Sequence, residues 1–362
     1  MCYHKSVVQK IDKLIDHYPA SFKPIRDDLE SIEDRFHVLM KKDDRLNTLV
    51  PTDTKEIHSL LTLYSQKDSL PASLTKPELS DLKYCLKALS GFREDGLYRY
   101  HENGFDYLPT PIITAGDPEN FKLFRWGLIP YYMSDKDKAM VLRTQTLNCI
   151  SEEMFDKPSF RDAFKNEQRC LIPVTGFYEW RWLDKQGSIK IPYYVTFRDQ
   201  KPRSIAGLYS RWKDKDTNEY YYSYTVLTTR ANTILDYVHN NKKRMPVFIA
   251  PEDEKTWLTK GLSKDQVLQM CQPYEDNTMR AYTISKHITT KNILTNTPEV
   301  MVPFNYNKAI HEADQFLQRG ERQKALAVFK ESMSASADVK KVDDQELKLI
   351  TAEGVKPELE MV

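Results

Sequence analysis

Cysteine at position 2 becomes the first residue of the chain once the initiator methionine is removed. A terminal Cys2 carries an α-amine with an ordinary pKa of roughly 7.7–8.0 beside a thiol of about 8.5, so each group has a reactive fraction near neutral pH. On an aldehyde, the amine forms a Schiff base and the thiol then closes on it to give a thiazolidine ring. No internal cysteine reacts in this way. The alternatives are a cysteine without special chemistry and a terminal-nucleophile hydrolase, in which the free amine serves as base for the thiol.

Two internal stretches offer groups for proton transfer. In "CLIPVTGFYEWRW", strand alternation places Phe177 and Glu179 on one face. A carboxyl group held among aromatic side chains is desolvated, which raises its pKa and lets it donate a proton near neutrality. The alternative is a rim glutamate paired with Arg181 or Arg169. His239, expected near the end of a helix, has an ordinary pKa of roughly 6.5 that suits proton transfer, although a lone histidine is more often structural.

A basic cluster follows His239 in "HNNKKRMPV". Lys242, Lys243 and Arg244 suit contacts with phosphates, and the same cluster is equally consistent with a solvated turn. Asn148, in "QTLNCISEE", gives no signal by itself.

Composition restricts the classes of protein to which this chain can belong. The chain has 362 residues, and its 53 Lys and Arg nearly balance 52 Asp and Glu, so any nucleic-acid binding must come from a local patch. The five cysteines are scattered without a C-x-x-C pair or a histidine at ligand spacing, so neither a disulfide framework nor a zinc site is expected. Charges in the first twenty residues exclude a signal peptide, and no stretch suits a bilayer span. We therefore expect a cytoplasmic protein without metal or cofactor.

The pattern of apolar residues predicts an α+β fold. Residues 6–18 have helical spacing, and three further helical stripes follow between 24 and 92. After Gly104 the chain changes to short β-rich runs broken by Pro and Gly, with helices expected at 152–165 and 231–239. This pattern favours a curled antiparallel sheet over a βαβ alternation. The end of the chain is expected to form one helix and a disordered charged tail.

The order of several motifs resembles one known family. The matching segments are "MC" at 1–2, "WGLIP" at 126–130, "LN" at 147–148, "KPSFR" at 157–161, "RCLIPVTGFYEW" at 169–180, "AGLYSRW" at 206–212, "TVLTTRAN" at 225–232 and "RMPV" at 244–247. In this order they resemble the SRAP family, the SOS-response-associated peptidases or abasic-site processing proteins. The resemblance covers about residues 1–20 and 98–305.

The resemblance implies a sensor of abasic sites in single-stranded DNA, active in DNA repair. Cys2, freed of Met1 by self-processing of the peptidase type, would form a thiazolidine crosslink with the ring-opened sugar by lyase-like Schiff-base chemistry. Asn148 would orient the terminus and the sugar, Glu179 would be the acid or base near the Schiff base, and His239 would serve ring opening and reversal. The residues expected to hold DNA are Trp126, Pro130, Trp180 and Arg244, by stacking and phosphate contact. Such a protein would be nucleoid-associated when bound to DNA.

The chain departs from the family pattern in three places. Family members often begin "MCGR", whereas Tyr3 and His4 stand here, and Ile150 replaces a second expected arginine. "HNNKKRMP" is longer than the frequent form, so the placement of His239 is open. We therefore expect weaker, still salt-dependent DNA binding.

The resemblance also divides the chain. Residues 1–23 plus 96–310 would form the SRAP core, 24–95 an inserted helical segment that binds a partner or guides DNA, and 311–362 the C-terminal helix and tail. Two other functions stay open from the sequence: a terminal-cysteine peptidase or amidase acting on peptides, and a DNA-binding protein without catalytic activity.

Overall fold

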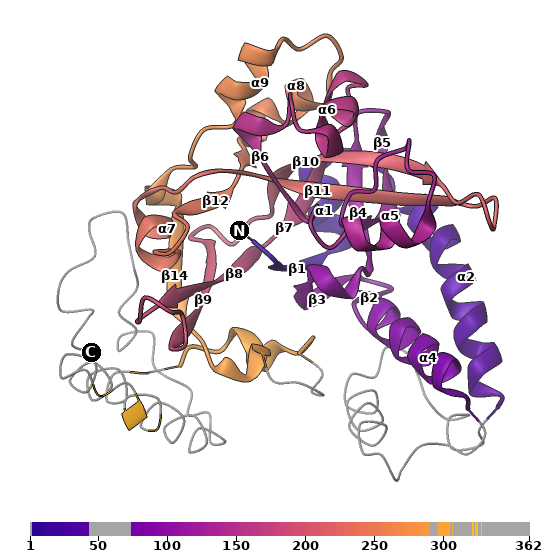
Figure 1. The fold of residues 1–362 in the computed structure, drawn as a ribbon, viewed down its shortest axis with the longest axis horizontal. Coiled ribbons are helices and arrows are strands. Elements are labelled where there is room, and N and C mark those ends of the chain that lie inside the picture. The colour runs from indigo at the N-terminus through magenta and orange to yellow at the C-terminus, as the bar shows by residue number, and fades with distance from the viewer. Residues whose placement is uncertain are drawn as a thin grey trace.

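The computed structural model describes residues 2–42, 74–289, 295–304 and 306, with a few isolated positions between 321 and 327. Two β-sheets lie at its centre, with helices around them (Figure 1). The helical stripe expected around residues 57–64 lies outside the described residues, as do the expected C-terminal helix and charged tail apart from the isolated positions between 321 and 327.

The first sheet places the N-terminal strand in its middle. Its six strands run in the order β14 (Met279–Thr283), β9 (Lys190–Phe197), β8 (Gly176–Trp182), β1 (His4–Lys10), β3 (Gly96–Asn103) and β2 (Phe92–Arg93). All of its pairings are antiparallel. The helix predicted over 6–18 is therefore wrong for its first half: residues 4–10 are a strand, and α1 covers only Ile11–His17. Hydrogen bonding to β3 and β8 on both sides outweighs the local helical spacing.

The second sheet closes into a barrel. Its path is β12 (Arg244–Pro246), β11 (Tyr220–Arg230), β5 (Asp117–Trp126), β4 (Pro109–Thr114), β7 (Arg169–Val174), β10 (Arg203–Lys213) and β13 (Phe248–Ile249). Strands β10 and β11 also pair with each other, which closes the ring formed by β11, β5, β4, β7 and β10. The predicted α+β fold with a curled, barrel-like sheet is thus confirmed. The pairing of β5 with β11 is parallel, which the prediction of an antiparallel sheet did not include.

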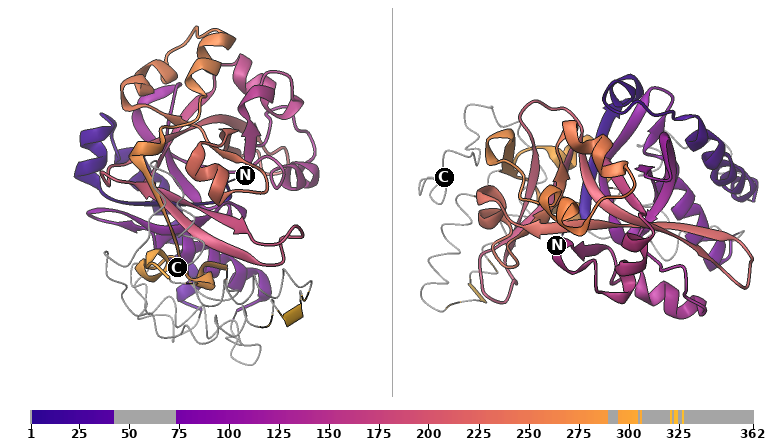
Figure 2. Two further views of the ribbon diagram at one scale, coloured as in Figure 1. Left: turned by 90° about the vertical axis from the view of Figure 1, so that its left-hand side faces the viewer. Right: turned by 90° about the horizontal axis from the view of Figure 1, so that it is seen from above.

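Helices cover the outside of both sheets, as the two views in Figure 2 show. They are α1, α2 (Lys23–Met40), α4 (Lys76–Leu89), α5 (Lys136–Leu142), α6 (Pro158–Lys165), α7 (Thr233–Val238), α8 (Glu254–Leu258) and α9 (Lys264–Met270). Short 3-10 turns lie at Gly104–Asp106, Ser151–Glu153, Pro251–Asp253, Asp276–Thr278, Lys286–Thr289 and Pro298–Met301.

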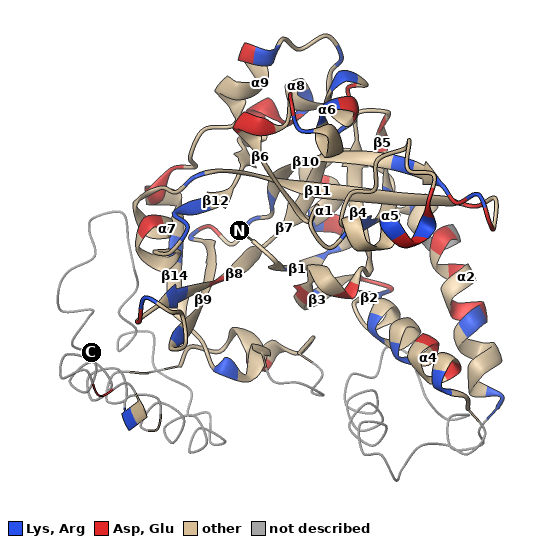
Figure 3. Ribbon diagram, viewed as in Figure 1, with Lys and Arg blue, Asp and Glu red and all other residues tan. Residues whose placement is uncertain are grey.

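The first and third of the predicted helical stripes between 24 and 92 form α2 and α4. Their apolar residues are buried, and α4 begins with a capping box in which Thr75 and Glu78 each bond to the other's backbone N–H. Both helices share one hydrophobic cluster with residues of the barrel, including Phe121 and Leu171. Basic and acidic residues are both present along these helices (Figure 3).

The helix predicted over 152–165 is shorter than expected. Lys157 is extended, with φ −64° and ψ 125°, because a residue before proline avoids the helical region. Pro158 then starts α6, while residues 151–153 form only a 3-10 turn.

Three absences concern the described part of the chain. All five cysteines are buried and free of disulfides. No group of three or more His, Cys, Asp or Glu side chains there is placed to hold a metal ion. None of the described helices is long and apolar enough to span a bilayer.

Candidate active site

Strand β1 brings the N-terminus into the interior. Its pairing with β8 ends at His4 opposite Tyr178, one residue before Glu179. Beyond it, Tyr3 accepts a backbone hydrogen bond of 2.8 Å from Gly104, so the chain stays fixed past the strand end. Cys2 is only 1% exposed. The terminal residues are therefore held by the sheet, whereas the sequence predicted a helix that begins at residue 6.

Asn148 holds the backbone of Cys2. Its Nδ2 donates a hydrogen bond of 2.7 Å to the Cys2 carbonyl, and both side chains are buried. Asn148 begins the short strand β6 (Asn148–Ile150), which pairs in parallel with β11. The preceding carbonyl, of Leu147, accepts a 2.6 Å hydrogen bond from Trp126 Nε1. Asn148 carries no signal of its own in the sequence, yet the fold places its side chain in contact with the Cys2 backbone.

Glu179 and His239 face each other beside the terminus. Glu179 Oε2 lies 3.8 Å from His239 Nε2, and the two side chains are 5% and 7% exposed. His239 caps α7, and its Nδ1 donates to the Arg244 carbonyl at 2.8 Å, so in the neutral ring Nε2 carries the lone pair that faces Glu179. The loop from 240 to 243 turns the chain back to provide that carbonyl, with Lys243 in the left-handed region at φ 51°.

Burial shifts the pKa values of the two reactive acids upward. Burial, reinforced by the nearby Glu179 carboxylate, raises the pKa of the Cys2 thiol to about 12. Burial also raises the pKa of Glu179, and His239 opposes this shift. At neutral pH the thiol is therefore protonated, and Glu179 holds its proton to higher pH than an exposed glutamate does. A rim glutamate, the alternative from the sequence, does not fit its 4% exposure.

Glu179 and His239 line a pocket of ≈ 410 Å³. It is lined by Tyr3, His4, Glu179, Trp180, Trp182, Lys190, His239, Asn241, Lys242 and Thr289. Trp180 and the His4 ring are in contact, with centroids 4.7 Å apart. Lys190 Nζ lies 4.4 Å from the centre of the Trp182 ring. Sequence reasoning missed His4, Trp182 and Lys190; the aromatic alternation after Glu179 was the available signal for Trp182.

Two of the four residues expected to hold DNA are buried. Trp126 is 1% exposed, its ring is packed against Tyr224, and its indole N–H serves the backbone next to Asn148. Pro130 is buried as well. Both side chains are packed in the interior of this structure, and their expected role in DNA binding stays a prediction. The exposed aromatic residues at this place are Tyr131 and Tyr132, at 56% and 44%.

Arg244 is engaged within the chain. Its guanidinium makes two hydrogen bonds to the Glu152 carboxylate, at 3.1 and 2.9 Å, and its Nη2 also donates to the Thr228 carbonyl. Together with its own carbonyl, which accepts from His239, Arg244 positions that histidine. Trp180 remains at the pocket, where its expected role in DNA binding stays a prediction.

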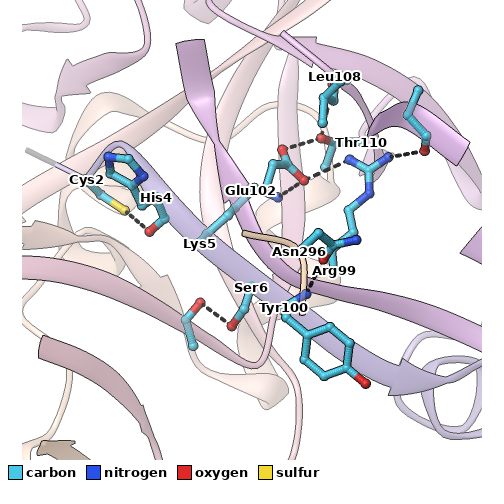
Figure 4. A network of polar contacts seen from close by, with 12 residues as sticks. Cys2, His4, Lys5, Ser6, Arg99, Tyr100, Glu102, Leu108, Thr110 and Asn296 are labelled. Carbon is cyan, nitrogen blue, oxygen red and sulfur yellow. Dashed lines mark hydrogen bonds and ion pairs between the residues drawn. The ribbon is translucent and has the colours of Figure 1, made fainter. Parts of the chain in front are cut away.

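A buried ionic cluster anchors β1 next to the pocket (Figure 4). Lys5 Nζ lies 3.0 Å and Arg99 Nη1 2.9 Å from Glu102 Oε2, while Thr110 donates to the other carboxylate oxygen at 2.6 Å. All three charged side chains are at most 2% exposed. Sequence reasoning did not predict this cluster, because its members come from three separate strands.

Comparison with known proteins identifies the family. A sequence model of the SOS response associated peptidase (SRAP) family matches residues 86–291, more than half of the chain. The chain belongs to the SRAP family. Asn148, Glu179 and His239 lie within the matched region of this SRAP chain, whereas Cys2 and β1 precede it.

Several relatives of this SRAP chain carry the same descriptive name. The abasic site processing protein YoqW of Bacillus subtilis is 34% identical over 192 residues, covering 52% of this chain and 80% of YoqW. The abasic site processing protein HMCES of Xenopus tropicalis is 29% identical over 196 residues, covering 49% of this chain and 55% of HMCES. A crystal structure of a protein from Bacteroides thetaiotaomicron is 36% identical, with a TM-score of 0.53 over 57% of this chain and 86% of that one.

Proposed function

We propose that this SRAP protein captures abasic sites in single-stranded DNA by forming a thiazolidine through Cys2, after Met1 has been removed. The observation that carries the proposal is the hydrogen bond from Asn148 to the Cys2 carbonyl, which fixes the terminus beside Glu179 and His239. Support also comes from the relatives named abasic site processing proteins. Self-removal of Met1, the peptidase part of the activity, belongs to the proposal.

The chemistry starts from a neutral α-amine on Cys2. The amine nitrogen bonds to the aldehyde carbon of the ring-opened sugar and passes a proton to the oxygen, which gives a carbinolamine. The Glu179 carboxyl donates its proton to the hydroxyl, the C–O bond breaks, water leaves and an iminium forms. The Cys2 sulfur then bonds to the iminium carbon and its proton returns to Glu179. Glu179 thus acts first as acid and then as base, for which its raised pKa is suited.

His239 acts before the amine attacks, when the sugar ring opens to the aldehyde. Its Nε2 lies 3.8 Å from Glu179 Oε2, both side chains line the pocket, and its tautomer is held by the Arg244 carbonyl. We assign it proton transfer at the sugar when the ring opens and when the crosslink reverses. Asn148 acts by position, since it holds the carbonyl of the residue that reacts.

DNA would enter along the pocket wall. Trp180 offers a ring for stacking, and Lys190 and Lys242 line the same pocket and offer charge for phosphates. We retain the division into a core of 1–23 plus 96–310, an inserted segment 24–95 and a C-terminal segment 311–362 as part of the proposal. In it, the inserted segment guides DNA or binds a partner protein.

A gel experiment tests the proposal. Purified protein is incubated with a single-stranded oligonucleotide that carries one abasic site, and heat-stable shifted bands are measured without added reductant. We expect a band for wild type, none for Cys2→Ala and an unchanged band for the matched variant Cys271→Ala, which alters another buried thiol. A wild-type protein that gives no band, or a Cys2→Ala variant that gives the same band, contradicts the proposal. Cleavage of peptides by a protein that leaves the oligonucleotide untouched would support the peptidase instead.

A further inference from the structure

Two histidines on neighbouring strands and one threonine lie in a line beside the pocket. His4 Nδ1 is 2.8 Å from His101 Nε2, and His101 Nδ1 is 2.6 Å from Thr295 Oγ1. The two imidazole planes differ by only 10°, and their centroids are 5.1 Å apart. With the nitrogens in contact, the rings meet edge to edge in nearly one plane. This is the geometry of an N–H···N hydrogen bond rather than of a face-to-face stack.

The line joins two cavities. At one end, His4 lines the pocket that also contains Glu179 and His239. At the other end, His101 and Thr295 line a second cavity of ≈ 40 Å³, which is large enough for water. This second cavity is polar, since Lys87 and Asp106 also line it and form an ion pair of 2.9 Å.

Both rings are neutral at physiological pH. Burial lowers the pKa of His4 to about 4, and burial together with the neighbouring His4 lowers the pKa of His101 well below its ordinary value. Each neutral ring has one N–H and one lone pair. The hydrogen-bonded line therefore has two arrangements. In one, His4 Nε2 is a base toward the pocket; in the other, every proton has moved one place and His4 Nε2 carries hydrogen.

We infer that His4, His101 and Thr295 form a proton relay that carries a proton from the Cys2 terminus, beside the pocket lined by Glu179 and His239, into the second cavity. The inference rests on the proposed function, because that chemistry needs a neutral amine while a terminal amine is largely protonated below its pKa of roughly 8. Once DNA covers the pocket, the relay gives the proton an exit that does not pass through the DNA.

In total, the relay moves one proton from the Cys2 α-ammonium to water in the second cavity. The Cys2 α-ammonium gives a proton to His4 Nε2, and His4 Nδ1 gives its own to His101 Nε2. His101 Nδ1 then gives a proton to Thr295 Oγ1, whose hydroxyl hydrogen passes to water in the second cavity. The amine is left neutral with its lone pair free to attack the aldehyde. Because one protein captures one lesion, a single transfer serves each reaction, and the reverse transfer serves reversal.

Charged and titratable groups surround both ends of the relay. Tyr3, Glu179, Lys190, His239 and Lys242 face the pocket end, Lys87, Arg99 and Asp106 face the other end, and Tyr178 packs against the His101 ring between them. All of them are unchanged when His101 or Thr295 is substituted. Their titrations therefore affect wild type and variant alike and cancel in the ratio of the two rates.

The test is the rate of crosslinking as a function of pH, with protein in excess over an oligonucleotide bearing one abasic site. His101→Gln keeps a donor and an acceptor but cannot pass a proton. We expect it to crosslink about tenfold more slowly than wild type near pH 6.5 and within about twofold near pH 9, where the amine arrives neutral. Thr295→Val, which removes only the terminal hydroxyl, should likewise be slower than wild type near pH 6.5 and close to wild type near pH 9. The control His287→Gln changes an exposed histidine and should match wild type at every pH.

The outcomes separate the relay from a structural role. His101 and Thr295 act through His4 as positioning residues, so a merely structural defect would lower the rate by the same factor at all pH values. A pH-independent ratio, or no loss of rate in either variant, overturns the relay. Should His101→Gln fail to fold, Thr295→Val decides. Absence of any crosslink in wild type overturns the proposed function instead, and is seen before the variants are compared.

Discussion

Two buried glutamates flank strand β1, Glu102 on β3 and Glu179 on β8, and their pKa values shift in opposite directions. Burial alone would raise the pKa of Glu102, but the charges of Lys5 and Arg99 and the Thr110 hydroxyl lower it below its ordinary value. Glu179 is equally buried, yet no side-chain cation lies as close to it as Lys5 and Arg99 lie to Glu102 among the ion pairs of the described residues, since His239 Nε2 is 3.8 Å away; burial therefore dominates, and the pKa of Glu179 is raised. Equal burial thus produces a permanent anion on one side of β1 and a proton donor on the other.

The difference separates anchoring from chemistry. The Glu102 cluster holds Lys5, three residues after the reactive cysteine, so it fixes β1 and with it the terminus. The Glu179 side leaves room for a substrate, because Glu179 and His239 both line a pocket of ≈ 410 Å³. Substitution of Glu102 should therefore mainly lower stability, whereas substitution of Glu179 should mainly lower the rate of crosslinking.

The largest effect is expected from Glu102→Gln. This substitution leaves Lys5 and Arg99 buried without their counter-charge, which costs about 3–5 kcal/mol of the free energy of unfolding. Urea denaturation measures the loss, with Glu179→Gln as the matched control on the other side of β1. Equal destabilisation by the two variants would contradict the distinction between the two carboxyl groups.

The second effect concerns the rate of crosslinking. Glu179→Gln removes the proton donor and should slow crosslink formation by about a hundredfold, whereas binding of an oligonucleotide without a lesion stays unchanged. A gel time course gives the rate, and fluorescence anisotropy gives the binding. Unchanged kinetics would remove Glu179 from the mechanism.

A smaller effect is expected from Asn148→Ala. Loss of the hydrogen bond to the Cys2 carbonyl leaves the terminus less well oriented, and we expect crosslinking to slow by about tenfold. The control Asn120→Ala removes an amide that bonds to Asp117 far from the pocket and should react like wild type. Equal rates for the two variants would show that the Asn148 contact is not needed.

The smallest effect is a pH-dependent difference in stability. Because the folded-state pKa of Glu179 is raised, ionisation of this carboxyl reduces stability as pH rises above its ordinary value of 4.5. Glu179→Gln should therefore have a higher Tm than wild type near pH 7, and the difference should vanish below about pH 4. Thermal melts at several pH values measure it. A difference that grows toward low pH would mean that the pKa is lowered, as it is for Glu102.

The sequence predicted the sheet and barrel better than it predicted the terminus. Short runs rich in β-branched and aromatic residues, broken by Pro and Gly, depend on local propensity and were interpreted correctly. Residues 6–10 have helical spacing, and only their position between β3 and β8 makes them a strand. Such long-range pairing leaves no local signal in the sequence.

The sequence indicates those site residues whose own side-chain chemistry is distinctive, and it does not indicate those that matter only through their position in the fold. Cys2 and Glu179 were selected from their own chemistry, whereas Asn148 came only from the family resemblance. Trp126 was expected at the DNA, but an indole that supports a backbone carbonyl from the interior has the same sequence appearance as one that stacks on a base. The relay through His101 and Thr295 joins residues 194 positions apart, which only the fold brings together.

The central claim is that the α-amine and the thiol of Cys2 both bond to one sugar carbon. Mass spectrometry of the protease-digested crosslink tests it directly. The account predicts an N-terminal peptide that begins at Cys2, with a mass equal to the sum of peptide and abasic oligonucleotide minus one water, unchanged by borohydride because a thiazolidine has no imine to reduce. An adduct on a lysine such as Lys5, an adduct that borohydride reduces, or a crosslinked peptide that retains Met1 would contradict the account.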